Sequence, residues 1–201
     1  TGGIVEEWIA ADGVRSPSVQ LRITPVGDLE IISTHDQILG GPSGQVFQAC
    51  TFPADPAYAR QIQSLALRVG EVLKSRGVLG RFGVDFVSVP VEDGWQHYAI
   101  EINLRKGGTT HTFQMLQFLT QGRYDTARAE FVTPDGATRC YYATDNVVNA
   151  AYRRLTPDDL VDVTDRHDLH FDAARQCGVV FNLIGALSEF GKIGVVAIDE
   201  D

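Results

Sequence analysis

Two neighbouring apolar runs of the chain carry side chains whose oxygen atoms could bind a divalent cation. Asp85 lies in the run 82–89, Glu101 and Asn103 lie in the run 98–104, and a Glu-Asp-Gly turn separates the runs. This pattern predicts a β-hairpin. Because side chains alternate along a strand, Glu101 and Asn103 share one face, and an antiparallel partner can bring Asp85 onto it. Mg²⁺ prefers such oxygen ligands and would offset the repulsion between the two carboxylates.

The residues that follow Asn103 add positive charge and a backbone that can approach a ligand closely. Arg105 and Lys106 come directly after the acidic strand, and Gly107 and Gly108 allow main-chain N–H groups near an anion. These features together predict a site for Mg²⁺ and a nucleotide, where phosphoryl transfer is the expected chemistry. The alternative is a set of polar side chains on a solvent-facing strand, because short motifs often match by accident.

The elements that must position this hairpin are short strands and two helices. Alternation and turn residues predict strands at 4–9, 18–24, 29–34 and 46–52. One helix is predicted from Asp55 and Pro56 to Gly77, and a second from Thr110 or Thr112 to about Gly122. The predicted fold is therefore α+β, an antiparallel sheet with flanking helices.

The last third of the chain has a different pattern. We expect a strand at 139–144, a helix that starts at Thr156 and Pro157, and a terminal hairpin of 178–184 with 193–198. We place a boundary near residue 123, which gives a sheet domain of residues 1–123 and a small α/β C-terminal domain of residues 124–201.

Composition excludes several classes of partner. The chain has 201 residues and a net charge of −9, which argues against nucleic acid and against an acidic membrane surface. No apolar stretch reaches the length of a membrane span. Three cysteines, far apart in the sequence, indicate reduced thiols and a cytoplasmic location.

The motifs resemble a known family. Gly-Val-Asp-Phe at 83–86, Glu-Ile-Asn-Leu-Arg-Lys-Gly-Gly-Thr-Thr-His at 101–111 and Leu-Ile-Gly-Ala-Leu-Ser-Glu-Phe-Gly-Lys at 183–192 are similar to the C-terminal lobe of ATP-grasp ligases. The resemblance is closest to the pheganomycin-type peptide ligase family, which has a small C-terminal domain. It implies that ATP phosphorylates a carboxylate and that an amine then attacks the acyl phosphate to form an amide.

The resemblance also implies roles for individual positions. It assigns two Mg²⁺ ions to Asp85, Glu101 and Asn103; catalysis to Arg105 and Lys106; ATP to Glu6, Glu7, Trp8, Ile9 and Gln37; and the carboxylate or amine substrate to Gly107, Gly108, Thr109, Thr110 and His111. For the segment 6–9, the alternative is an edge strand with exposed glutamates.

Two further features resemble catalytic or phosphate-binding motifs. His35 and Asp36 suggest acid–base chemistry, but no Gly-x-Ser-x-Gly motif accompanies them, so a hydrolase triad is not favoured. The loop 40–45 is rich in glycine but lacks the Lys-Ser/Thr ending of a phosphate-binding loop. We interpret it as a connection at the mouth of the site.

An ATP-grasp site lies between two lobes, and the lysines that hold the phosphates precede the hinge at which this chain begins. We therefore expect a fragment or one part of a two-part enzyme, inactive without the missing N-terminal lobe. The apolar face left exposed would favour a homo-oligomer. The substrates would be small-molecule or peptide carboxylates and amines. The alternatives are a non-catalytic protein-interaction module and a metal-dependent phosphohydrolase.

Overall fold

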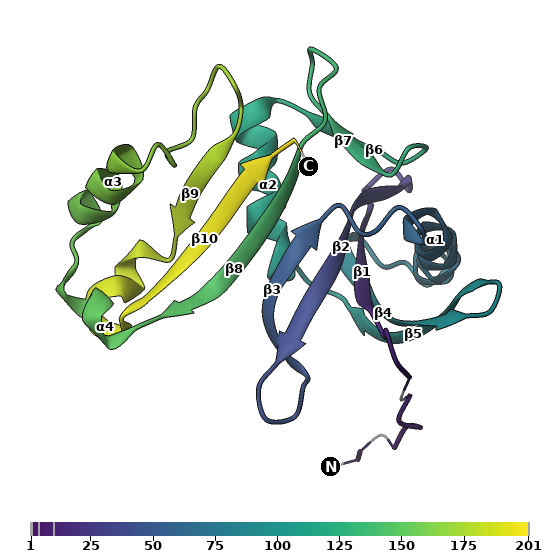
Figure 1. The fold of residues 1–201 in the computed structure, drawn as a ribbon. Helices are drawn as coiled ribbons and strands as arrows, with labels where there is room; N and C mark the ends of the chain where they lie inside the picture. Colours follow the sequence, from purple (N-terminus) through teal and green to yellow (C-terminus); the bar gives the residue numbers. More distant parts are fainter. Residues whose placement is uncertain (1, 4, 10, 201) are drawn as a thin grey trace.

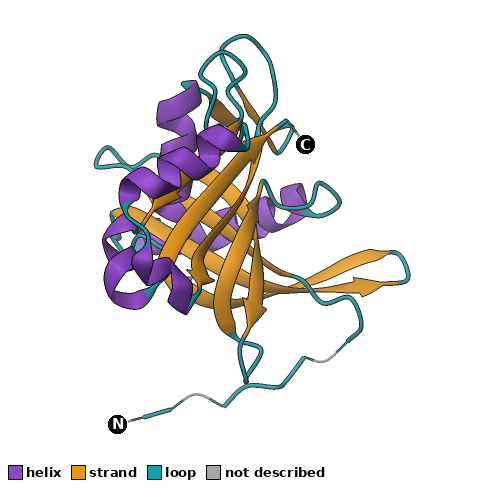
Figure 2. Ribbon diagram, turned by 60° about the vertical axis from the view of Figure 1, so that its left-hand side comes forward, coloured by secondary structure: helices purple, strands orange, loops and turns teal. Residues whose placement is uncertain are grey.

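The computed structural model is organised around one eight-stranded antiparallel sheet, flanked by helices (Figures 1 and 2). It describes residues 2–3, 5–9 and 11–200. The strand order is β5-β4-β1-β2-β3-β8-β10-β9, and β6 and β7 form a separate two-stranded sheet. The strands are β1 Ser16–Ile23, β2 Leu29–Gly40, β3 Val46–Phe52, β4 Gly80–Val91, β5 Gly94–Asn103, β6 Arg123–Asp125, β7 Glu130–Val132, β8 Cys140–Val148, β9 Gly178–Asn182 and β10 Lys192–Asp199. The helices are α1 Ala59–Ser75, α2 Thr109–Thr120, α3 Pro157–Arg166 and α4 Leu187–Phe190, with 3₁₀ turns at Ala150–Arg154 and Ile184–Ala186. The predicted α+β class is confirmed.

One face of the sheet is covered by α1. Val19 and Leu21 of β1 and Val84 of β4 are fully buried there, together with Ile62 of α1. Alternation along β1 therefore leaves the intervening residues on the opposite face. The apolar positions of α1 recur at helical spacing, and Gly77, with φ of 77°, follows the end of the helix.

The opposite face is covered by α2, over β3, β8 and β10. Phe52 packs against Phe113 with ring centroids 5.3 Å apart and against Tyr141 at 5.0 Å. Leu116 of α2 and Val196 of β10 are fully buried in the same cluster. These aromatic contacts fix α2 on the half of the sheet formed by β3, β8 and β10, and the loop before α2 connects it to β5, which carries Glu101 and Asn103.

Most predicted elements are confirmed, and three details are wrong. No strand forms within 5–9, where Val5 is fully exposed; positions 4 and 10 lie outside the described residues. The first helix begins at Ala59, because the Asp55 carboxylate accepts a hydrogen bond from the Ala57 N–H (2.8 Å) and forms a turn before the helix. The second helix begins at Thr109, so neither predicted threonine precedes it as a cap.

The eight-stranded sheet takes strands from both sides of residue 123, the position of the predicted domain boundary. β3 pairs with β8 from Ala49 to Phe52, so the C-terminal strands extend the same sheet. A separate cluster of Leu160, Leu187 and Ile193 lies at the far end. The division into two domains remains a prediction. Among the described residues, no helix is both long enough and apolar enough to cross a membrane.

Candidate active site

The β4–β5 hairpin brings the predicted metal ligands onto one face. Asp85 pairs with Glu101 and Gly83 pairs with Asn103. On its other side, Asp85 pairs with Ser18 of β1. Directly paired residues of antiparallel strands point to the same side of a sheet. The predicted common face of the three side chains is therefore confirmed.

Asp85 is a partly buried carboxyl group on this face, and several neighbouring groups act on its pKa. Burial raises the pKa of its carboxyl group, and repulsion from Glu101 raises it further. Hydrogen bonds from Ser18 and Asn103 and the charge of Arg105 act in the opposite direction. The Asn103 Nδ2 donates to Asp85 Oδ2 at 2.9 Å, which leaves the amide oxygen of Asn103 as the atom able to face a cation.

This donor set fits Mg²⁺. In the described part of the chain, no three or more His, Cys, Asp or Glu side chains cluster as a metal site. The set therefore consists of two carboxylates completed by the neutral oxygen of Asn103, and Ser18 adds a hydroxyl beside Asp85. Hard oxygen ligands that leave room for water and phosphate oxygens are typical of Mg²⁺ sites.

The loop after β5 closes the site from the side of α2. The Gly107 N–H donates to Thr110 Oγ1 and the Thr110 N–H donates to Gly107 O, both at 3.1 Å, so the loop is held to the first turn of the helix. The hydroxyl of Thr109 is buried and has no partner among the described residues. A buried hydroxyl without a hydrogen bond costs free energy, so a ligand that pairs with the Thr109 hydroxyl would recover that cost.

A cavity of about 930 Å³ joins these elements. The predicted positions that line it are Glu6, Glu7, Trp8, Ile9, Gln37, Asp85, Glu101, Asn103, Arg105, Gly107, Gly108 and Thr109. Three predicted positions lie outside the lining. The Lys106 carbonyl accepts a hydrogen bond from the Arg105 side chain, and Thr110 Oγ1 accepts one from the Gly107 N–H. The third position, His111, is exposed on α2. The chemical roles of all these residues remain predictions.

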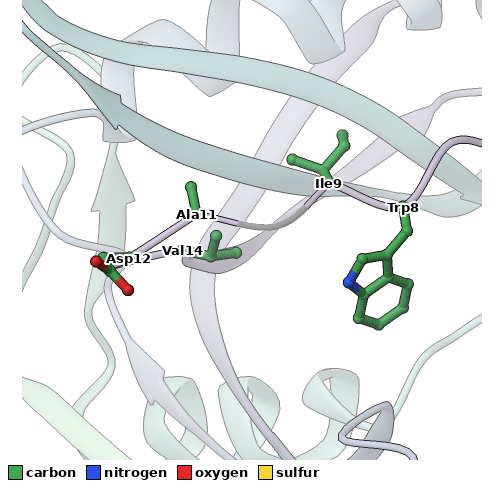
Figure 3. Close-up of a pocket in the computed structure, with 5 residues that line it drawn as sticks. All are labelled: Trp8, Ile9, Ala11, Asp12 and Val14. Atoms are coloured by element: carbon green, nitrogen blue, oxygen red, sulfur yellow. The ribbon is translucent and has the colours of Figure 1, made fainter.

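The segment 5–9 reaches the cavity as extended chain. Its described residues pair with no strand, and Trp8 is 70% exposed. Trp8 and Ile9 project from opposite sides of the segment (Figure 3). The residues predicted to contact adenine are therefore at the cavity, but the strand predicted to carry them is wrong.

Sequence reasoning missed several residues of the cavity wall. Ser18 and Gln20 of β1 line it, as do Phe47 of β3 and Ile100 of β5. The alternation of 18–24 signalled that Ser18 and Gln20 share a face, but only the pairing of β1 with β4 shows that Asp85 lies on it. Ile100 enters at a register shift in β5, for which the sequence gives no signal.

Comparison with protein families gives two matches. Residues 1–127 match a model described as IQCH-like, ATP-grasp. Residues 159–201 match the PGM1 C-terminal domain.

Two curated proteins are similar in sequence. L-propargylglycine–L-glutamate ligase of Streptantibioticus cattleyicolor is 33% identical over 204 residues, which cover 98% of this chain and 39% of that protein. IQ motif-containing protein H of Danio rerio is 27% identical over 139 residues, 68% of this chain and 13% of that protein. The chain thus spans less than half the length of these relatives.

Solved structures share the fold at low sequence identity. The phosphoribosylaminoimidazole carboxylase ATPase subunit of Aquifex aeolicus superposes with a TM-score of 0.58 at 13% identity, over 98% of this chain and 54% of that one. A second structure is the biotin carboxylase domain of the Hydrogenobacter thermophilus 2-oxoglutarate carboxylase, in complex with ADP, MgADP and bicarbonate. It superposes with a TM-score of 0.60 at 11% identity, over 95% of this chain and 43% of that one.

Proposed function

We propose that this chain, which belongs to the IQCH-like ATP-grasp family, contributes the nucleotide and metal site of a ligase that joins a carboxylate to an amine. The observation that carries the proposal is the pairing of Asp85 with Glu101 on a face shared with Asn103, at a cavity also lined by Arg105. The similar ligase named for L-propargylglycine and L-glutamate supports amino acids as the first substrates to test.

The metal ligands would be Asp85, Glu101 and Asn103. Mg²⁺ bound there would neutralise charge on the phosphate oxygens of ATP. The chain itself provides the pre-organised part of the site, because the hairpin fixes both carboxylates and the Asn103 amide holds Asp85 at 2.9 Å. Two ions are expected, as in the family resemblance.

Reaction would proceed in two displacements. An oxygen of the substrate carboxylate attacks the γ-phosphorus of ATP, and ADP leaves. The amine nitrogen then attacks the acyl carbon, phosphate leaves, and the nitrogen gives up a proton. Arg105 would stabilise the negative charge of the phosphoryl group and of the acyl phosphate. The Thr109 hydroxyl and the backbone of Gly107 and Gly108 would orient the substrate that faces α2.

Oxygen transfer tests this scheme. The complete natural protein is supplied with ATP, Mg²⁺, amino acids labelled with ¹⁸O in the carboxylate, and amine acceptors. We expect amide formation and transfer of one ¹⁸O atom to the released phosphate for each amide made, and loss of both in Glu101→Gln. Glu30→Gln is the matched control, since Glu30 pairs with Arg22 away from the cavity (2.6 Å).

Two results would contradict the proposal. Phosphate that carries oxygen from water, released without any need for an amine, would favour the phosphohydrolase alternative. Full ligation by Glu101→Gln would remove the assigned metal role.

A further inference from the structure

A buried chain of hydrogen bonds links two strands of the sheet to the first turn of α2. His35 Nε2 of β2 lies 2.9 Å from the Tyr141 hydroxyl of β8, and that hydroxyl lies 3.0 Å from Thr112 Oγ1. Thr112 Oγ1 in turn donates to the Thr109 carbonyl at 3.0 Å. The exposed fractions of His35, Tyr141 and Thr112 are 0%, 2% and 4%, so these hydrogen bonds are shielded from solvent.

The direction of every hydrogen bond in this chain follows from the number of protons. A carbonyl only accepts, so the single hydroxyl proton of Thr112 goes to Thr109. The Tyr141 hydroxyl must then donate to Thr112 Oγ1, and its oxygen is left to accept from His35. The imidazole of His35 therefore carries its proton on Nε2, and Nδ1 is bare.

The surroundings of His35 agree with this assignment. Its Nδ1 is buried and has no hydrogen-bond partner among the described residues. Burial lowers the pKa of His35 to about 3, so the ring is neutral near pH 7. A neutral ring supplies the one N–H donor that the Tyr141 hydroxyl requires, whereas a second N–H, on Nδ1, would face no acceptor. His35 therefore acts as a permanent hydrogen-bond donor to Tyr141. A buried ring that stays neutral near pH 7 does not fit the acid–base role that the sequence suggested for His35.

Apolar residues could fill this space at less cost in desolvation. The ring of Phe52 lies 5.2 Å from His35 and 5.0 Å from Tyr141, between centroids. Buried polar groups cost free energy unless they are paired, and a network of paired groups chiefly fixes one geometry. What this network fixes is the peptide group of Thr109, which begins α2 and lines the cavity.

We propose that His35, Tyr141 and Thr112 are positioning residues that hold the Thr109 peptide and so aim the Gly107–Thr109 loop at the substrate. Thr109 itself is 5% exposed, and its hydroxyl has no partner among the described residues. Thr109 lines the cavity, and the hydrogen bond to its carbonyl restrains the backbone that carries this hydroxyl. The effect on catalysis rests on the proposed function; the effect on the loop does not.

Matched substitutions of threonine test the proposal. Thr112→Val removes the hydroxyl and keeps the shape, whereas Thr112→Ser restores it. Thr120→Val is the control, since Thr120 Oγ1 donates to Leu116 O (2.7 Å) at the other end of the same helix. In the complete natural protein, we expect Thr112→Val to speed amide hydrogen exchange at residues 107–113 by about tenfold, the value of one hydrogen bond. Thr112→Ser and Thr120→Val should leave that exchange near the wild-type rate.

Ligation kinetics give a second measurement on the same variants. The KM for the carboxylate or amine substrate should rise about tenfold in Thr112→Val while the KM for ATP stays constant, and Thr112→Ser should recover it. Exchange and KM unchanged in Thr112→Val would overturn the proposal. So would a Thr112→Ser variant that behaves like Thr112→Val, because the hydroxyl would then not be the cause.

The tautomer of His35 supplies a measurement that needs no activity. In the ¹⁵N spectrum of histidine-labelled protein, the signals absent from His35→Gln should show a protonated Nε2 and a bare Nδ1. A protonated Nδ1 would refute the hydrogen-bond chain. If the wild type did not ligate but the tautomer and the exchange behaved as expected, the proposed function would fail and the positioning of the loop would stand.

Discussion

Neutralising Glu101 should stabilise the metal-free protein. Glu101 is paired directly with Asp85, and paired positions have Cβ atoms about 5 Å apart. Two unit charges at that distance repel by about 0.8 kcal/mol in water and by about 3 kcal/mol at an effective dielectric constant of 20. Because Glu101 is exposed, the lower end applies. We expect Glu101→Gln to raise the free energy of unfolding by about 1 kcal/mol in EDTA.

Saturating Mg²⁺ and ATP should make the wild type more stable than Glu101→Gln, the reverse of the order in EDTA. A ligand at 100 times its Kd stabilises the folded state by about 2.7 kcal/mol, and the variant has lost a carboxylate ligand. The wild type should therefore become the more stable of the two. Urea unfolding of both proteins, followed by circular dichroism in EDTA and in Mg²⁺ with ATP at equal ionic strength, measures the crossing.

Glu30→Gln serves as the control for this reversal. Glu30 is exposed and forms an ion pair with Arg22, so its loss should cost about 0.5 kcal/mol or less, equally with and without Mg²⁺. The reasoning would be refuted if Mg²⁺ with ATP stabilised Glu101→Gln as much as the wild type.

Three further predictions concern the fold. The pKa of His35 falls from 6.5 to about 3 on folding, so the unfolded chain takes up a proton first, and stability should drop by about 1.4 kcal/mol per pH unit between pH 6.5 and about pH 3. A pH series of urea unfolding checks this, and a drop of equal size in His35→Gln would contradict it. Gly122→Ala should cost about 1–3 kcal/mol, because the new methyl group would meet the Phe131 ring and lie 2.9 Å from the Val132 carbonyl; an unchanged melting temperature would refute that contact. Thr156→Ala should cost about 1 kcal/mol through loss of the capping box at α3, and Thr156→Ser should restore it.

Local patterns predicted the elements whose partners lie nearby in the sequence. The β4–β5 hairpin needs only a two-residue connection between its strands, so period-2 alternation was enough to place Glu101 and Asn103 on one face. The cap of α3 was equally readable, because Thr156 and Asp159 bond to each other within one turn. Segment 5–9 has strand-like composition, but the described chain provides it with no partner strand.

Features built by distant segments could not be predicted. The pairing of β3 with β8 joins residues about ninety positions apart, and it merges the C-terminal strands with the first sheet. His35 and Tyr141 are 106 positions apart, so their hydrogen bond has no local signature. The same limit applies to Phe47, which joins the cavity wall only because β3 lies beside β2 and reaches α2.

The most direct measurement of the central claim is the calorimetric titration of the complete natural protein with ATP, in Mg²⁺ and in EDTA. A binding isotherm that requires Mg²⁺ and disappears in Asp85→Asn is the predicted result, because the paired carboxylates of the hairpin would hold the metal beneath the phosphates. Binding that is equally strong in EDTA and unchanged in Asp85→Asn, or no binding at all, would contradict the account.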